Sequence, residues 1–126
     1  MNTLASGDPI DTYVSALATD DADTALTTLS AAATFHSPFN AWGSRHVPSV
    51  FRARSGAFND LLVTSVIRDH DRAVILWQAT AGGSQVEAAE LVSISDGAIY
   101  RVDVFLRPAT ALDAVHQAMV AAWPQT

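Results

Sequence analysis

Apolar residues recur at helical spacing in the first part of the chain and at alternate positions in much of the second part. The pair Asp8-Pro9 is typical of a helix start, because aspartate caps a helix and proline is favoured at its first position. The apolar face of the helix predicted after this pair is formed by Ile10, Tyr13, Val14 and Leu17. The acidic residues within 20–23 predict the start of a second helix. Its apolar stripe would consist of Ala22, Ala25, Leu26, Leu29 and Ala33.

Two further elements are predicted before the alternating region. Residues 34–37 read as a short extended segment that ends at Pro38, because proline cannot donate a hydrogen bond within a sheet. Residues 47–58 carry apolar positions at helical spacing, with Pro48 tolerated in the first turn. Two arginines fall within this third helix, and we expect both to be solvated although Arg54 lies on the apolar stripe.

From residue 61 the apolar period changes to two, which predicts strands. Four are expected, over residues 61–69, 72–81, 84–95 and 98–107. The last two separators, Gly82-Gly83 and Asp96-Gly97, are typical two-residue hairpin turns, so the strands form an antiparallel meander. After Pro108, the pair Thr110 and Asp113 resembles a capping box and predicts a final amphipathic helix. The predicted fold class is therefore α+β, in a single domain that spans residues 1–126.

The turn at Asp96-Gly97 fixes the register of the last hairpin, so that Glu90 falls opposite Asp103. The same count across the preceding turn places Ile75 opposite Glu90. Because side chains alternate, one face of the sheet is predicted to hold Ala73, Ile75, Trp77, Ala79, Val86, Ala88, Glu90, Val92, Ile99, Arg101, Asp103 and Phe105. The other face is also apolar, with Val74, Leu76, Leu91, Val102, Val104 and Leu106.

The charged residues on the first of these faces suggest chemistry. Two carboxylates about 5 Å apart in an apolar site cannot both ionise cheaply, so one of them is expected to hold a proton at neutral pH. Glu90 has the more apolar neighbours and is expected to be protonated, while Arg101 keeps Asp103 ionised as a base. The alternative is a surface hairpin in which Arg101 screens two solvated acids. A single β-bulge would also invalidate the pairing.

Composition narrows the classes of function. The chain has no cysteine and no lysine, which excludes disulfides, thiolate chemistry, Schiff bases and a phosphate-loop lysine. Its net charge of -6 argues against nucleic acids and anionic membranes as partners. The histidines show no metal-binding spacing, so we expect neither a metal nor another cofactor. The N-terminal segment has neither a cationic start nor an apolar run, which favours a cytoplasmic protein without a leader.

The order of elements, together with the segments TYVSAL, TFHSPF and FLRPATAL, resembles the SnoaL-like branch of the nuclear transport factor 2-like superfamily. This superfamily includes polyketide cyclases, ketosteroid isomerases and limonene epoxide hydrolases. The resemblance implies a curved antiparallel sheet wrapped by helices into a cone around an apolar pocket, with dimerisation through the outer face of the sheet. It also implies a small apolar metabolite as ligand.

The resemblance also implies roles for individual residues. Tyr13 matches the tyrosine that donates a hydrogen bond to a substrate oxygen in the isomerases, and Glu90 matches a protonated aspartate there. Asp103 resembles the aspartate on the last strand of hydrolases and cyclases, and Ser37 stands where the isomerases have their base. The residues expected to line the pocket are Trp77, Phe105, Ile75, Ala88, Phe35, Ser37 and Trp42.

Two hypotheses about function remain open at this point. In the first, the protein is a cofactor-free enzyme that isomerises, cyclises or hydrates a small apolar metabolite by proton transfer, with Asp103, Glu90, Tyr13 and Arg101 as its catalytic residues. In the second, it is a ligand-binding or dimerisation module of the same fold. The two differ in whether Glu90 and Asp103 point into a dry cavity.

Overall fold

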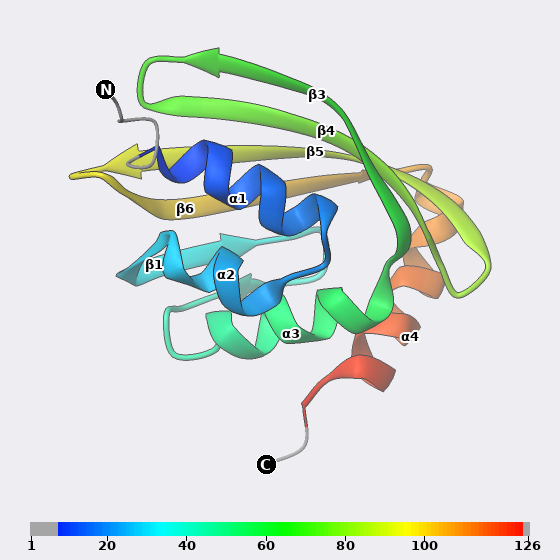
Figure 1. Ribbon diagram of the computed structural model, residues 1–126. Helices are drawn as coiled ribbons and strands as arrows, with labels where there is room; N and C mark the ends of the chain where they lie inside the picture. The colour runs from blue at the N-terminus through cyan, green and yellow to red at the C-terminus, as the bar shows by residue number, and fades with distance from the viewer. Residues whose placement is uncertain (1–7, 125–126) are drawn as a thin grey trace.

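The computed structural model describes residues 8–124 of the chain. It contains a curved six-stranded sheet with three helices on its concave side and a fourth helix across one end (Figure 1). The helices are α1 (Pro9–Ala18), α2 (Ala22–Thr27), α3 (Val47–Ala57) and α4 (Leu112–Ala122). The strands are β1 (Leu29–His36), β2 (Ala41–Trp42), β3 (Asn59–Asp69), β4 (Arg72–Ala81), β5 (Ser84–Ser95) and β6 (Ala98–Arg107). The predicted α+β class is confirmed. Residues 1–7, which carry the expectation about a leader, lie outside the described residues.

The first two helices begin where aspartates predict them to begin. The side chain of Asp8 accepts a hydrogen bond from the backbone nitrogen of Ile10 at the start of α1, and Asp21 caps α2 in the same way. The predicted length of α2 is wrong, because the chain turns into β1 at Leu29. Residues 29–33 were expected to continue the helical stripe and instead extend the short strand predicted at 34–37.

The sheet has the order β2-β1-β6-β5-β4-β3. Strands β3 to β6 form the predicted antiparallel meander, whereas β1 runs parallel to β6 and joins the two halves of the sheet. The glycine turn is a two-residue turn, with Ala81 opposite Ser84 and Ile75 opposite Glu90 as predicted. Both of its central residues have positive φ, which explains why glycine occupies these positions.

A β-bulge in the last hairpin overturns the predicted pairing of the acids. The turn itself is as predicted, with Ser95 opposite Ala98, but the register shifts between Ser93 and Ile94. Beyond this shift Glu90 lies opposite Val104, and Asp103 lies opposite Leu91. One extra residue reverses the side-chain alternation. Residues 101–107 of β6 therefore present the opposite face to that expected.

The reversal exchanges the two faces of β6. Val102 and Val104, predicted on the outer face, are buried in the core, while Phe105, predicted inside, is 60% exposed. The side chains of Arg101 and Asp103 accordingly lie on the outer face. On β4 and β5 the predicted inner set is correct, since Ile75, Trp77, Val86 and Val92 are all buried.

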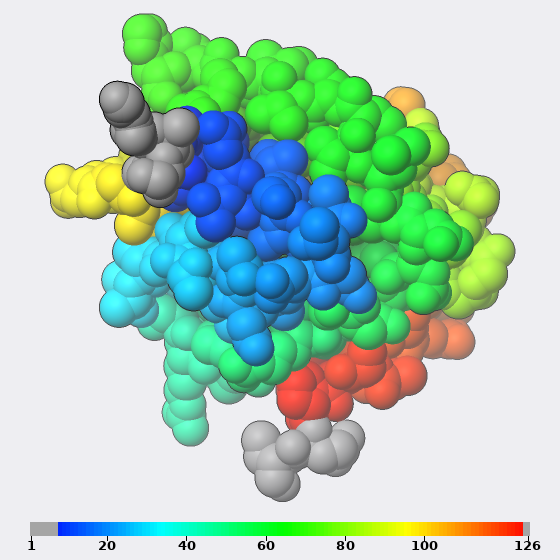
Figure 2. Space-filling view, in the orientation of Figure 1, coloured from blue at the N-terminus to red at the C-terminus, as the bar shows by residue number. Residues whose placement is uncertain are grey.

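Helices close the concave side of the sheet around the core. In the space-filling view α1 and α2 lie over the middle of the sheet and α4 lies below them, against α3 (Figure 2). The start of α4 differs from the prediction, because a 3-10 turn over Ala109–Ala111 precedes it and no side chain caps it. Among the described residues, no helix combines the length and the apolarity that crossing a membrane requires.

Candidate functional site

A fully buried carboxylate, Glu90, lies at the centre of the inner face of the sheet. Its Oε1 accepts a hydrogen bond from the Tyr13 hydroxyl at 2.7 Å, and its Oε2 accepts one from Trp77 Nε1 at 2.6 Å. Arg54 donates to both oxygens and forms a buried ion pair with this carboxylate. Tyr13, Trp77 and Arg54 all donate to the Glu90 carboxylate. Glu90 therefore acts here as an acceptor and not as the predicted protonated donor.

Four elements bring these side chains together. Tyr13 lies on the buried face of α1, and Arg54 lies on the buried face of α3 among Val50 and Phe51. Trp77 and Glu90 come from β4 and β5, on positions that share the inner face of the sheet. The network therefore ties two helices to the sheet.

Burial and the neighbouring charges set the protonation of the network. Burial, followed by the charge of Glu90, raises the pKa of Tyr13 well above its usual range. Burial acts to lower the pKa of Arg54, but the adjacent Glu90 carboxylate outweighs it and the pKa is raised. Aromatic rings also surround the guanidinium, whose carbon lies 5.2 Å from the ring centre of Phe51 and 5.5 Å from that of Phe35. Arg54 is therefore a cation held in place on several sides.

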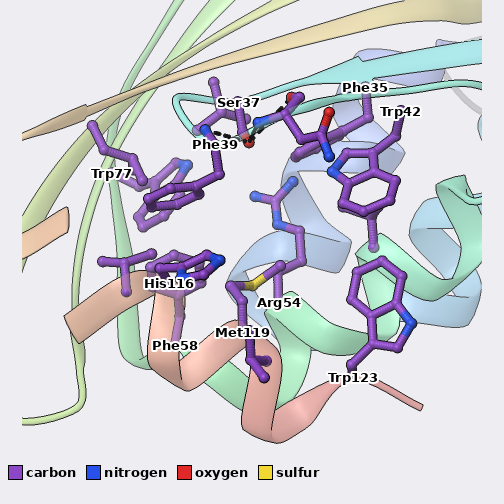
Figure 3. A pocket seen from close by; sticks show the side chains of 16 residues that line it. Phe35, Ser37, Phe39, Trp42, Arg54, Phe58, Trp77, His116, Met119 and Trp123 are labelled. Carbon is purple, nitrogen blue, oxygen red and sulfur yellow. Dashed lines mark hydrogen bonds between the residues drawn. The ribbon is translucent and has the colours of Figure 1, made fainter. Parts of the chain in front are cut away.

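A pocket of about 460 Å³ lies beside this network, and Arg54 projects into it between aromatic walls (Figure 3). Sixteen residues line it: Phe35, Ser37, Phe39, Asn40, Trp42, Val50, Arg54, Phe58, Trp77, Val104, Leu106, Val115, His116, Met119, Val120 and Trp123. All three tryptophans of the chain are among them. The pocket is thus largely apolar, with few polar groups.

The C-terminal helix and the β1–β2 segment form one side of the pocket. Trp42 packs against Trp123 with ring centres 5.0 Å apart, and Phe39 packs against His116 at 5.3 Å. These contacts join residues that are far apart in sequence. The pocket therefore exists only when α4 is docked against the rest of the fold.

The chemistry available in this pocket is limited. Among the residues that line it, Arg54 and His116 alone carry titratable side chains, and no carboxylate is present. Over residues 8–124 no group of three or more His, Asp or Glu side chains is arranged to hold a metal ion. The arrangement can enclose an apolar molecule, donate hydrogen bonds from Arg54, and exchange a proton at His116.

The predicted pocket residues fall into two groups. Phe35, Ser37, Trp42 and Trp77 line the pocket. The other three do not line it. Ile75 and Ala88 are buried in the core, and Phe105 lies on the outer face because of the bulge.

The predicted catalytic residues are also divided. Tyr13 and Glu90 do meet, but both are completely buried behind the pocket, and the Tyr13 hydroxyl donates to Glu90 rather than toward a ligand. Arg101 and Asp103 pair with each other on the outer face, with Arg101 Nε 2.9 Å from Asp103 Oδ2. The predicted pairing of Glu90 with Asp103 is wrong.

Two residues of this site were expected to have other roles. Arg54, predicted to be solvated, is the ionic partner of Glu90. The signal was present, since a buried helical stripe that includes an arginine needs a buried acid to accompany it. His116, predicted as a packed histidine of the last helix, lines the pocket.

Comparison with known proteins places the fold. No family model matches the sequence, and no curated protein matches it either. Solved structures do match. A bacterial protein with a cystatin-like fold from Silicibacter pomeroyi has a TM-score of 0.82 at 20% identity, over 90% of this chain and 83% of that one. A steroid delta-isomerase from Pseudomonas aeruginosa has a TM-score of 0.82 at 18% identity, over 90% and 87%. An NTF2-like protein of unknown function from Cytophaga hutchinsonii has a TM-score of 0.71 at 18% identity, over 88% and 97%.

The chain therefore has the nuclear transport factor 2-like fold, also described as cystatin-like. This confirms the fold that the resemblance implied. Because one fold supports many activities, the function has to be argued from the pocket.

Proposed function

We propose that the protein binds a small, largely apolar molecule in the pocket, with a hydrogen-bond acceptor of that molecule directed to Arg54. The observation that carries this proposal is the cavity of about 460 Å³, whose lining is mainly aromatic and aliphatic and includes one buried cation. Small-molecule sites generally enclose roughly 300–1,000 Å³ and combine apolar walls with a few placed polar groups.

Arg54 has donors to offer such a ligand. A guanidinium carries five N–H groups. The hydrogen bonds of Arg54 within residues 8–124 run from Nη1 and Nη2 to Glu90 and Tyr13. The remaining donors are available to a ligand oxygen. Around them the aromatic walls favour a flat ring system.

The proposal is tested with acetonaphthone, a bicyclic aromatic ketone that carries a single acceptor. It should quench the fluorescence of the pocket tryptophans, and calorimetry should give a saturable site. Met119→Trp, which fills part of the pocket, should weaken binding by about tenfold or more, equivalent to about 1.4 kcal/mol. The matched control is Gln117→Trp, an exposed position on the same helix that does not line the pocket. Equal binding by both variants would place the ligand elsewhere.

A second candidate function is catalysis by proton transfer, of the isomerase or cyclase kind. The observation that favours it is His116, a histidine at the pocket, since histidine is the side chain that most often acts as a general acid or base. The isomerase of the same fold lends support by analogy. In this reaction His116 takes a proton from the carbon next to a carbonyl group while Arg54 donates to the carbonyl oxygen, and the proton then returns to carbon.

This candidate has its own test in deuterated water. If His116 transfers protons, the protein should exchange the methyl hydrogens of acetonaphthone for deuterium, as followed by NMR. His116→Gln should remove the exchange, whereas His70→Gln, at a highly exposed position, should keep it. If the methyl hydrogens exchange no faster with ligand-saturated protein than in buffer alone, the protein is a non-catalytic binding module.

We also propose that the protein forms a homodimer through the outer face of the sheet. Leu76, Ala89 and Phe105 form a row across three strands of this face, and all three line a groove of about 350 Å³. The exposed Phe105 ring beside an apolar groove suits a two-fold contact, in which each copy places its ring in the groove of the other.

A further inference from the structure

We propose that Glu90, acting through Arg54, sets the charge preference of the pocket, so that it accepts uncharged ligands and rejects carboxylates. This inference rests on the proposed function, because it concerns which molecules the same pocket takes. Glu90 does not line the pocket, so it is a positioning residue and not a contact residue.

The charges around the pocket cancel. Arg54 is the one permanently charged side chain among the lining residues, and considered alone it would attract an anion. The carboxylate of Glu90 already neutralises it, from the side away from the pocket. A ligand carboxylate would therefore meet a site with no net charge and would lie close to a second carboxylate. Two like charges repel strongly in surroundings of low dielectric.

The geometry prevents Glu90 from moving aside for an anion. Its two oxygens are held by Tyr13 and Trp77 as well as by Arg54. Arg54 is equally constrained, because Nη1 also donates to the Tyr13 hydroxyl at 3.2 Å and aromatic rings pack around the guanidinium. A ketone, ester or amide oxygen needs one free N–H from this cation and no rearrangement of the pair. An uncharged acceptor is thus the ligand that the network accommodates.

The experiment compares two probes with the same ring system, the ketone acetonaphthone and the carboxylate naphthoate. Wild-type protein should prefer the ketone. Glu90→Gln keeps the size of the side chain but removes its charge, and so leaves Arg54 as an unbalanced cation. The ratio of the two affinities should then shift toward naphthoate by about tenfold or more, because charge-assisted hydrogen bonds are roughly twice as strong as neutral ones.

The chain offers a close control. Its only other glutamate, Glu87, lies three positions away on the same strand, is exposed, and pairs with Arg107. Glu87→Gln removes the same charge from the protein but should leave the ratio of affinities unchanged. A loss of fold or rigidity would weaken both probes together, so only a change in their ratio reports on charge preference. The double variant Arg54→Gln with Glu90→Gln has no unbalanced cation, so its ratio of affinities should again favour the ketone, as in wild-type protein.

A variant that folds poorly still gives an answer. Removing one partner leaves a buried charge, so Glu90→Gln is expected to be destabilised, and naphthoate should then raise its melting temperature more than acetonaphthone does. If Glu90→Gln does not fold at all, Arg54→Gln provides the mirror measurement. It leaves the glutamate as the lone charge, and a naphthylmethylammonium cation should bind Arg54→Gln more tightly than it binds the double variant, which lacks the charge of Glu90 as well.

The outcomes separate this inference from the proposed function. Failure of wild-type protein to bind acetonaphthone would count against the proposed function. The inference itself is judged by formate as well, an anion small enough to reach Arg54 without an aromatic site. If neither naphthoate nor formate stabilises Glu90→Gln more than Glu87→Gln, and the mirror variant shows no gain for the cation, Glu90 does not set the charge preference.

Discussion

Two arginine–carboxylate pairs flank the same sheet, one on each face. Arg54 and Glu90 are 6% and 0% exposed, and Tyr13 and Trp77 complete the hydrogen bonds of the carboxylate. Arg101 and Asp103, on the outer face, are 49% and 15% exposed and bond mainly to each other. The same pair of chemical groups can shape a pocket when buried and do little when solvated, because water screens the outer pair and not the inner one.

The largest difference is expected when one partner of the inner pair is removed. Glu90→Ala leaves Arg54 buried without a counter-charge and should lower the free energy of unfolding by about 3–5 kcal/mol. Glu87→Ala, on the exposed side of the same strand, should have little effect, since exposed ion pairs contribute little. Denaturant unfolding followed by circular dichroism measures both.

The double variant Arg54→Met with Glu90→Leu sharpens this test. It removes both charges and leaves apolar side chains of similar size. Such replacements are often neutral or stabilising, so the variant should recover most of the stability that Glu90→Ala loses. If the double variant is as unstable as Glu90→Ala, most of the loss of stability comes from Tyr13 and Trp77, which lose their hydrogen-bond acceptor, and not from the broken ion pair.

The contrast between the two faces also shows what the sequence could predict. Turn residues and the period of two define β4 and β5, so alternation places Glu90 on the same face as Ile75 and Trp77. Which of the two apolar faces points inward does not follow from alternation, and the resemblance to the family favoured the face of Glu90. The face of β6 does not follow from the turn, because the register shifts between Ser93 and Ile94. Counting back from Asp96-Gly97 assumes that no such shift occurs. One shifted residue was enough to move Asp103 and Phe105 to the other face.

Long-range contacts were equally beyond sequence reasoning. Tyr13 and Glu90 could each be singled out, yet their 2.7 Å contact requires the docking of α1 on the sheet. The position of Arg54 on an apolar stripe indicates a buried acid as its partner, but it does not identify Glu90, 36 residues later, as that acid. The parallel pairing of β1 with β6 is a further tertiary contact of this kind.

A smaller effect is expected from the tyrosine of the inner network. Tyr13→Phe removes a hydroxyl that donates to Glu90 and accepts from Arg54, and should cost about 1–3 kcal/mol of unfolding free energy. The pKa of Tyr13 is raised in the folded protein by burial and by Glu90. Its contribution is therefore complete below the ordinary tyrosine pKa of about 10. As the pH rises further, the unfolded chain loses a proton that the folded chain keeps, and stability falls.

Denaturant unfolding of wild type and Tyr13→Phe across this alkaline range measures the effect. The difference in stability between the two proteins should narrow as the pH rises above about 10. Taking the difference removes the contributions of groups that both proteins share. A constant difference at all pH values would mean that the Tyr13 proton is no better held in the folded protein than in the unfolded chain.

The outer face should respond through association instead of folding. If the proposed dimer forms there, Phe105→Arg should convert it to a monomer, because loss of a central aromatic contact commonly costs more than about 1 kcal/mol of binding and here also introduces charge repulsion between copies. Analytical ultracentrifugation measures this. Binding of acetonaphthone by the monomer should be close to that of wild type, since the Phe105 ring lies on the opposite face from the pocket. A wild-type protein that sediments as a monomer would rule out this use of the face.

The smallest effect is expected for Asp103, the residue predicted from the sequence to be the base. Asp103→Asn keeps the size of the side chain and removes only the charge that Arg101 holds at the surface. Because this pair is screened by solvent and faces away from the pocket, the affinity for acetonaphthone should change by less than about twofold. The same holds for any deuterium exchange that the protein catalyses.

The two isosteric variants, Glu90→Gln and Asp103→Asn, remove one carboxylate each from opposite faces, so calorimetry on both compares the faces directly. If Asp103→Asn altered binding or exchange as much as Glu90→Gln does, residues 101–107 of β6 would have to turn their other face to the pocket. The bulge between Ser93 and Ile94 would then be absent in solution.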